Sequence, residues 1–267
     1  MSASQFLPLL LLLMGGQGTG KPAIRDFDLK TLEMLGGTIF LRDAYAARAT
    51  DILLAELGSM DAYQKEGILG WIVTDLDEQV VVRFVKQVEG TFQVVYDVTF
   101  PSPEKGVLNK ASGALPPAHL NQFRARQQAL TDLPAYCSDR YNTVVLPDVD
   151  GDGFLVYALA ATTEPGKVMI GGHYRLTVSA NGREIEQTDR LFNSCLSLER
   201  EKDQDGEIAA HVTSHVISPT PLEIHVFLNL MHGRPIYVVT TDGIIWKVYQ
   251  GAITKEGTVE DMKKKSP

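Results

Sequence analysis

Acidic side chains alternate with other residues in one short stretch of the sequence. Asp148, Asp150 and Asp152 have the spacing of the first half of a calcium loop, in which alternate carboxylates converge on one ion and Gly151 permits a sharp bend. A complete loop would supply a bidentate acidic ligand where this sequence has Leu159, inside an apolar run. Because Asp and Gly also favour turns, the same residues predict a strand-turn-strand hairpin. The stretch therefore indicates either a plain hairpin or a weak Ca2+ site.

Histidines concentrate near the C-terminus, where they suggest zinc chemistry. His211, His215 and His225 form a candidate Zn2+ site, because neutral imidazole is a common zinc ligand. If residues 208–217 form a strand, His211 and His215 share a face but stand about 13 Å apart, too far for one ion to bind both. One of them could still join His225 across the intervening Ser-Pro-Thr-Pro turn. The alternative is that these histidines are polar, half-exposed strand residues.

The N-terminus carries a glycine-rich segment with two incompatible interpretations. Residues Gly15–Lys21 have the spacing of a phosphate-binding loop, but the magnesium-binding Ser or Thr that should follow the lysine is replaced by Pro22. The first twenty residues contain no Asp, Glu, Lys or Arg, and their apolar run, Phe6–Met14, is shorter than the ~20 residues of a membrane-spanning helix. We therefore interpret residues 1–20 as a cleaved signal peptide, which predicts an exported protein, periplasmic or secreted.

The composition excludes some classes of partner. Hydrophobic residues make up 44% of the chain and charged residues 22%, as in an ordinary globular protein. The formal net charge is -8 at pH 7, whereas duplex nucleic acid demands clustered Lys and Arg. The short basic run Lys263–Lys265 lies in a polar C-terminal stretch that is typical of a solvated end. We expect no nucleic-acid partner and no membrane span in the mature chain; the partner is an unknown protein or a small ligand.

Two cysteines, Cys137 and Cys195, are present. A lone pair of cysteines in an oxidising compartment is usually bonded, so export predicts a disulfide between them. The alternative is two separate buried thiols. Their spacing excludes a C-x-x-C redox or zinc motif.

The first half of the chain changes from a helical to a strand pattern. Apolar residues recur with a helical period over residues 26–57, and Gly36-Gly37 interrupts them, which predicts two helices joined at the glycines. Three predicted strands form a meander: residues 71–74, 80–85 and 91–100. Residues 101–117, rich in Pro, Gly, Ser and Lys, predict a surface loop.

The second half is predicted to be one helix followed almost wholly by strands. The helix covers residues 118–130. The strands cover residues 142–146, 153–162, 168–179, 183–198, 208–217, 222–230, 236–240 and 244–251. Asn181-Gly182 and Asp242-Gly243 predict two-residue hairpin turns of type I′. In the strand at 168–179 we expect one face to be dry, with Tyr174, Leu176 and Val178, and the other to carry His173, Arg175 and Thr177.

These patterns predict an α+β fold: N-terminal helices and a β-meander, followed by a helix and a larger, mostly antiparallel β-sheet. The expected divisions are a signal peptide at 1–20, a helix-plus-meander part at 21–117, an antiparallel β part at 118–253 and a polar tail at 254–267.

The sequence names no reaction. It contains no G-x-S-x-G or S-x-x-K motif, and neither cysteine has a recognised catalytic neighbourhood. The function expected is that of a non-catalytic envelope or secreted protein, whose exposed sheet face or loops bind a partner or small ligand. The alternative is a metal-dependent hydrolase that uses His211, His215 and His225.

Overall fold

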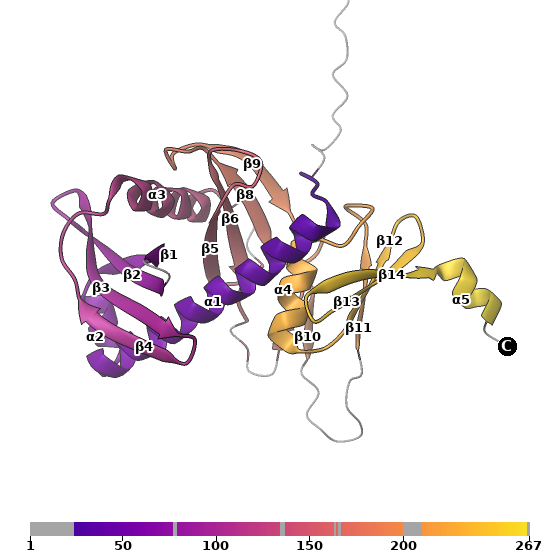
Figure 1. Cartoon of the computed structure of the whole chain (residues 1–267), viewed down its shortest axis with the longest axis horizontal. Coiled ribbons are helices and arrows are strands. Elements are labelled where there is room, and N and C mark those ends of the chain that lie inside the picture. Colours follow the sequence, from indigo (N-terminus) through magenta and orange to yellow (C-terminus); the bar gives the residue numbers. More distant parts are fainter. Residues whose placement is uncertain are drawn as a thin grey trace, which may run out of the picture.

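The computed structural model describes residues 24–76, 79–133, 137–162, 164, 167–199 and 210–265. Over these ranges it contains five helices and fourteen strands, and most strand pairs are antiparallel (Figure 1). The predicted α+β class is confirmed. The predicted signal peptide lies outside the described residues.

One long helix, α1 (Leu29–Leu57), begins the described fold. The Asp28 side chain caps it by accepting a hydrogen bond from the Thr31 amide at 3.0 Å. The expectation of two helices is wrong, because Gly36 and Gly37 lie inside α1. A Cβ at Gly36 would lie 2.4 Å from the Val226 Cβ, so this glycine allows a close helix crossing rather than a break.

The second half of α1 packs on a four-stranded meander. After α2 (Met60–Lys65), the strands run in the order β1 (Ile68–Leu76), β2 (Gln79–Val88), β3 (Thr91–Ser102) and β4 (Lys105–Lys110). The loop expected at 101–117 therefore contains a strand. Its polar composition suits β4, an edge strand whose lysines and asparagine face solvent.

A second sheet follows α3 (Pro117–Thr131), close to the predicted helix. Its antiparallel order is β5 (Tyr141–Pro147), β6 (Phe154–Ala160), β8 (Tyr174–Val178) and β9 (Ile185–Arg190), and the short strand β7 (Lys167–Met169) pairs separately with β10 (Ser197–Glu199). Helix α3 covers one face through Ala125 and Ala129.

Every residue of β8 is buried, so the expected division into a dry and a wetter face is wrong. His173 and Arg175 are 1% and 0% exposed, although they were expected opposite the dry face. The reason is that the face opposite α3 packs against α4 and α1, which places the sheet between two helical layers. The strand therefore carries polar side chains into the interior.

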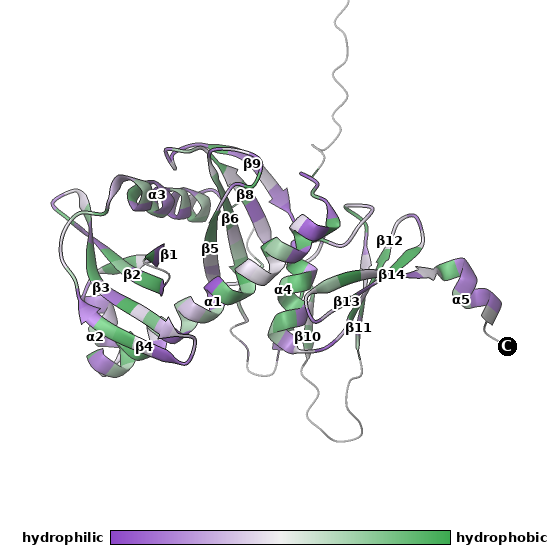
Figure 2. Cartoon of the chain, in the orientation of Figure 1, coloured by the Kyte–Doolittle hydropathy of each residue, from purple (hydrophilic) through white to green (hydrophobic). Residues whose placement is uncertain are grey.

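The segment predicted as a strand at 222–230 forms helix α4 (Glu223–His232) instead. Each residue from Glu223 to Asn229 is buried. The segment is short, and its β-branched and aromatic residues Ile224, Val226 and Phe227 favour strand in a sequence pattern. Figure 2 shows this helix as largely hydrophobic.

The fourth sheet is mixed rather than wholly antiparallel. Strands β11 (His211–His215) and β12 (Ile236–Thr240) are parallel, with α4 as their crossover, and β13 (Ile244–Tyr249) and β14 (Ala252–Thr258) complete the sheet. The polar tail expected at 254–267 includes part of β14 and a helix, α5 (Val259–Lys265).

The predicted type I′ turns differ in detail. Gly182 and Gly243 have positive φ angles of 71° and 76°, but Asn181 and Asp242 do not. Both residues of a pair have positive φ at Glu89-Gly90 (48° and 79°) and Gln250-Gly251 (51° and 81°), as type I′ turns require.

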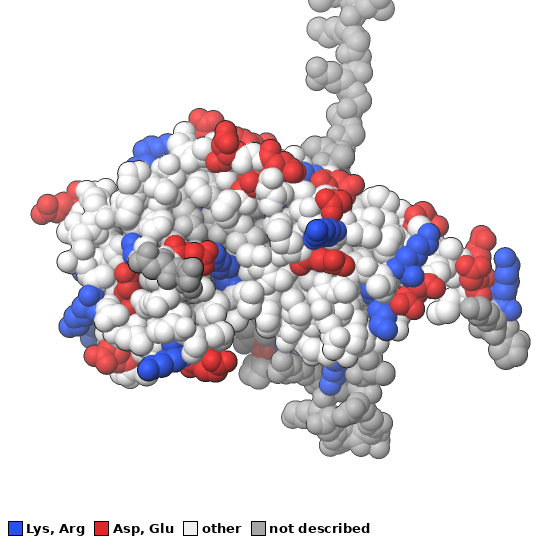
Figure 3. Space-filling model, viewed as in Figure 1, with Lys and Arg blue, Asp and Glu red and all other residues white. Residues whose placement is uncertain are grey.

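The surface reflects the acidic composition. Figure 3 shows acidic side chains gathered over the edge of the molecule near β9. No helix in the described ranges is both long and apolar enough to cross a membrane.

Candidate functional site

The two cysteines lie at bonding distance, as predicted. The Sγ atoms of Cys137 and Cys195 are 2.00 Å apart, and the bond closes a separation of 58 residues. It links the segment before β5 to the segment before β10.

Asp148 and Asp150 are paired with an arginine rather than with each other around an ion. Arg25 donates from Nη1 and Nη2 to the Asp148 carboxylate at 2.6 and 2.7 Å, and from Nη2 to Asp150 at 3.0 Å. Arg25 thereby holds the pKa of Asp148 below its usual value. The Asp148 backbone amide also donates to the Gly153 carbonyl at 2.9 Å. This hydrogen bond closes the turn between β5 and β6, in agreement with the hairpin interpretation. Asp152 is exposed and takes no part in the arginine pairing.

The proposed zinc histidines come together only in part. The rings of His215 and His225 stand 4.8 Å apart, whereas His211 lies beside His232. His215 Nε2 is hydrogen-bonded to Ser218 Oγ at 2.7 Å, and His225 Nδ1 accepts from the Leu222 amide at 2.9 Å. Among the described residues, no group of three or more His, Cys, Asp or Glu is arranged to hold a metal ion. The geometry lends no support to either metal hypothesis.

The sequence did not indicate that His173 joins His215 and His225 around Phe192. The Phe192 ring lies 6.1, 6.3 and 5.2 Å from the three imidazoles, respectively. Burial lowers the pKa of His173 and of His215 to about 4, and that of His225 well below its usual value. The cluster is therefore neutral at pH 7.

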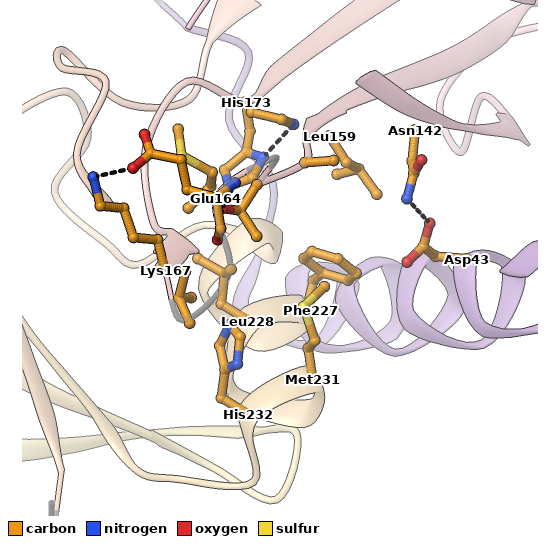
Figure 4. Close-up of a pocket in the computed structure, with 15 residues that line it drawn as sticks. Asp43, Asn142, Leu159, Glu164, Lys167, His173, Phe227, Leu228, Met231 and His232 are labelled. Carbon is orange, nitrogen blue, oxygen red and sulfur yellow. Dashed lines mark hydrogen bonds and ion pairs between the residues drawn. The ribbon is translucent and has the colours of Figure 1, made fainter. Parts of the chain in front are cut away.

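A pocket of about 520 Å³ opens between α1, β6, β7 and α4. Its wall mixes apolar and polar side chains in similar numbers. The lining side chains include Asp43, Asn142, Leu159, His173, Phe227 and Met231. Figure 4 shows Asp43 and Asn142 at one side, Phe227 and Met231 between, and the ion pair of Glu164 and Lys167 at the other.

Asp43 is a carboxylate without a countercharge. It lies on α1 and accepts one hydrogen bond, from the side-chain amide Nδ2 of Asn142 at 3.3 Å. Among the described residues no cation pairs with it, since the neighbouring Arg42 is paired with Asp75. Burial raises the pKa of Asp43 to about 6, and the Asn142 hydrogen bond only partly opposes this effect.

His173, on another part of the wall, carries a buried donor that has no partner among the described residues. Its Nδ1 accepts from the Ala160 amide at 3.0 Å, so the proton of the neutral ring sits on Nε2. That Nε2 is buried and forms no hydrogen bond within the described part of the chain. The Met169 carbonyl is near enough to oppose the fall in pKa, but not in hydrogen-bonding geometry.

A network of buried charged side chains holds the N-terminal end of α4 in place. Arg175 donates from Nη1 to Glu223 at 2.7 Å and from Nη2 to Asp189 at 2.8 Å, and Tyr157 donates to Glu223 at 3.1 Å. Arg175 also donates to the Arg25 carbonyl. The network ties β6, β8, β9, α4 and the segment before α1 together, and so holds two walls of the pocket in place.

Together, the fold and the pocket define an α+β protein with one long helix shared between two cores and a cavity of mixed polar and apolar lining beside the middle of that helix. No protein-family model matches the sequence. No curated protein and no solved structure is significantly similar to it.

Proposed function

We propose that the protein is an exported, non-catalytic binding protein that holds a small ligand in the pocket between α1, β6 and α4. The observation that carries the proposal is a pocket wall that combines apolar side chains with two polar groups left incompletely partnered among the described residues. These groups are the Asp43 carboxylate, which has a hydrogen bond but no cation, and His173 Nε2, which has no hydrogen bond. Ligand pockets typically combine apolar walls with a few convergent polar groups, and their volumes run from roughly 300 to 1,000 Å³.

The chemistry of the wall favours binding over catalysis. The hydroxyl among the lining side chains, that of Thr162, is exposed and donates to the Glu164 carbonyl at 3.0 Å. His173 Nδ1 is occupied by a backbone amide, so this ring is not free to take a proton from a nucleophile. The hydrolase alternative also lacks a metal-holding group among the described residues.

Export is supported by the Cys137–Cys195 bond, because disulfides persist in oxidising compartments. The proposed location is the periplasm or the extracellular space. N-terminal sequencing of the mature product is expected to begin at Thr19 or Lys21. An intact Met1 on a cytosolic product would overturn the proposal of export.

Native mass spectrometry of protein purified gently from its natural compartment tests the binding function. We expect a noncovalent small-molecule adduct that is released on denaturation. Ala161→Trp should fill the pocket and remove the adduct, since Ala161 lines it. Ala55→Trp, at an exposed position of α1, is the matched control and should retain the adduct. An adduct that survives Ala161→Trp, or none in any preparation, would contradict the proposed site.

Zinc provides a separate test of the hydrolase alternative. A metal bound only by the folded state must raise the melting temperature. We expect added Zn2+ to leave the melting temperature unchanged and no zinc to copurify with the protein. Stoichiometric zinc would instead favour the hydrolase.

A further inference from the structure

We infer that the ligand of this pocket is a small amphiphilic amine, whose ammonium group pairs with the Asp43 carboxylate while its apolar body lies against Leu159, Phe227 and Met231. This inference rests on the proposed function, because it names the chemical class that the pocket takes.

The charge of Asp43 carries the first step. A half-buried carboxylate that has one neutral hydrogen-bond donor and no cation is poorly compensated, and burying such a charge is costly unless it is paired. The other charged side chains of the wall, Glu164 and Lys167, form an ion pair with each other at 2.6 Å. The remaining titratable side chains of the wall are His173 and His232. A cationic ligand therefore supplies the charge that the pocket lacks.

The rest of the wall sets the character of the ligand beyond its amine. Leu159 and Phe227 are buried, and Met231 is 43% exposed at the pocket mouth. Such a surface stabilises an alkyl or aryl body by removing it from water. Methionine adapts to irregular shapes, so the apolar part of the site tolerates more than one body.

His173 gives a second, independent observation that the site accepts a ligand. Its side chain is 1% exposed, it lines the pocket, and its Nε2–H is unpartnered within the described residues. A neutral Nε2–H group at this place would donate a hydrogen bond to a hydroxyl or carbonyl oxygen of the ligand. It does not favour a second cation, so the ammonium group lies at Asp43 and not at His173.

Affinity for an amine should depend on pH through Asp43. The carboxylate must be ionised to pair with an ammonium group, and its pKa in the free protein is about 6. Amine affinity is therefore expected to be constant above pH 7 and to fall as pH drops through 6, by about tenfold per pH unit well below it. His173 stays neutral over this range, because its pKa is about 4.

Isothermal calorimetry with three probes of one length tests the inference: hexylamine, 1-hexanol and hexanoate, each titrated into the purified protein at pH 7.5. We expect hexylamine to bind at least about tenfold more tightly than 1-hexanol, since a charge-assisted hydrogen bond is worth about that factor or more. Hexanoate should bind most weakly, because its charge repels Asp43.

Two matched variants test whether Asp43 causes the preference for hexylamine over 1-hexanol. Asp43→Asn should reduce hexylamine affinity to that of 1-hexanol and leave 1-hexanol binding unchanged, which also shows that the variant is folded. Asp51→Asn, at an exposed position of the same helix, should change neither.

The outcomes separate the inference from the proposed function. Equal binding of hexylamine and 1-hexanol, or an amine preference that survives Asp43→Asn, overturns the amine inference and leaves a binding pocket in place. Tighter binding of hexanoate also overturns it, and would assign recognition to His173 or Lys167. Failure of all three probes to bind overturns the amine inference. The proposed function is contradicted by a different result: no native adduct, or an adduct that Ala161→Trp does not remove.

Discussion

Arg175 Nη1 lies 2.7 Å from Glu223 Oε1, and both side chains are fully buried. The pair joins the middle of β8 to the first turn of α4, across the layer that separates the sheet from the helix. Asp189 compensates the same guanidinium at 2.8 Å. The position of α4 therefore depends on a charge cluster in the interior, not on apolar packing alone.

Arg175→Met should destabilise the protein by about 3–5 kcal/mol, because it leaves Asp189 and Glu223 as buried carboxylates without a cation. Urea or guanidinium unfolding measures the loss. Arg42→Met is the control, since its partner Asp75 is 64% exposed and an exposed ion pair contributes at most about 1 kcal/mol. Equal losses of unfolding free energy in the two variants would show that the buried network stabilises the fold no more than an exposed ion pair does.

Gly36 and Gly37 are neighbours in α1 with opposite expected responses to alanine. At Gly36 a Cβ would lie 2.4 Å from Val226 Cβ, so Gly36→Ala should cost about 1–3 kcal/mol by forcing α1 and α4 apart. At Gly37 nothing lies within 4 Å of the added atom, so Gly37→Ala should stabilise the helix by about 0.5–1 kcal/mol. Thermal unfolding of the two variants compares them, and a matching sign would contradict the close crossing.

The histidine cluster should make the fold sensitive to acid. The pKa values of His173 and His215 fall from 6.5 in the unfolded chain to about 4 in the folded protein. Between these values the unfolded chain binds protons that the folded protein does not, so stability is lost as pH falls from 6.5 towards 4. Each group contributes up to about 1.4 kcal/mol per pH unit in this window.

His225→Asn tests this acid sensitivity, because the asparagine Oδ1 can replace Nδ1 as acceptor for the Leu222 amide. Unfolding measured from pH 7 to pH 4 should show a shallower loss than in the natural protein. His211→Asn, at a half-exposed position outside the cluster, should change the slope less. A slope that His225→Asn leaves unchanged would place the acid sensitivity elsewhere.

Asp43 should act on stability in the opposite direction. Its folded-state pKa of about 6 lies above its ordinary value of 3.8, so the folded protein holds this proton more tightly and stability falls as pH rises between the two values. Asp43→Asn should therefore stabilise the free protein at pH 7.5, by up to about 2 kcal/mol, and have little effect at pH 3.5. Unfolding at both pH values measures the difference, and equal effects at both would argue against a half-buried, uncompensated charge.

Local pattern was sufficient to predict much of this fold. The alternation of apolar residues located β3, bounding turn residues located β6, and the strand predicted at residues 236–240 has the same bounds as β12. The cysteine pair followed from a chemical argument about compartment. Helix α4 was not found in this way, because Ile224, Val226 and Phe227 favour strand when only local pattern is considered.

The pocket lay beyond sequence reasoning for a different reason. Asp43 and Asn142 are 99 residues apart, and neither belongs to a motif. Gly36-Gly37 appeared as a helix break because the residue that requires the glycine, Val226, belongs to another element. Arg175, which holds α4 in place, was also missed, because the strand pattern placed it opposite the dry face and did not indicate that this second face is buried.

Helix α1 contributes to two separate cores. Its first half supplies Leu32, Leu35 and Ile39 to the core around α4, and its second half supplies Ala46, Ala49 and Leu53 to the core of the meander. Both cores pack against this one helix, so opening either core removes contacts that hold the helix in place for the other. The amide hydrogens of the two cores should therefore exchange as one cooperative unit. Asp43 falls between the two halves, and a ligand bound there would therefore protect both cores at once.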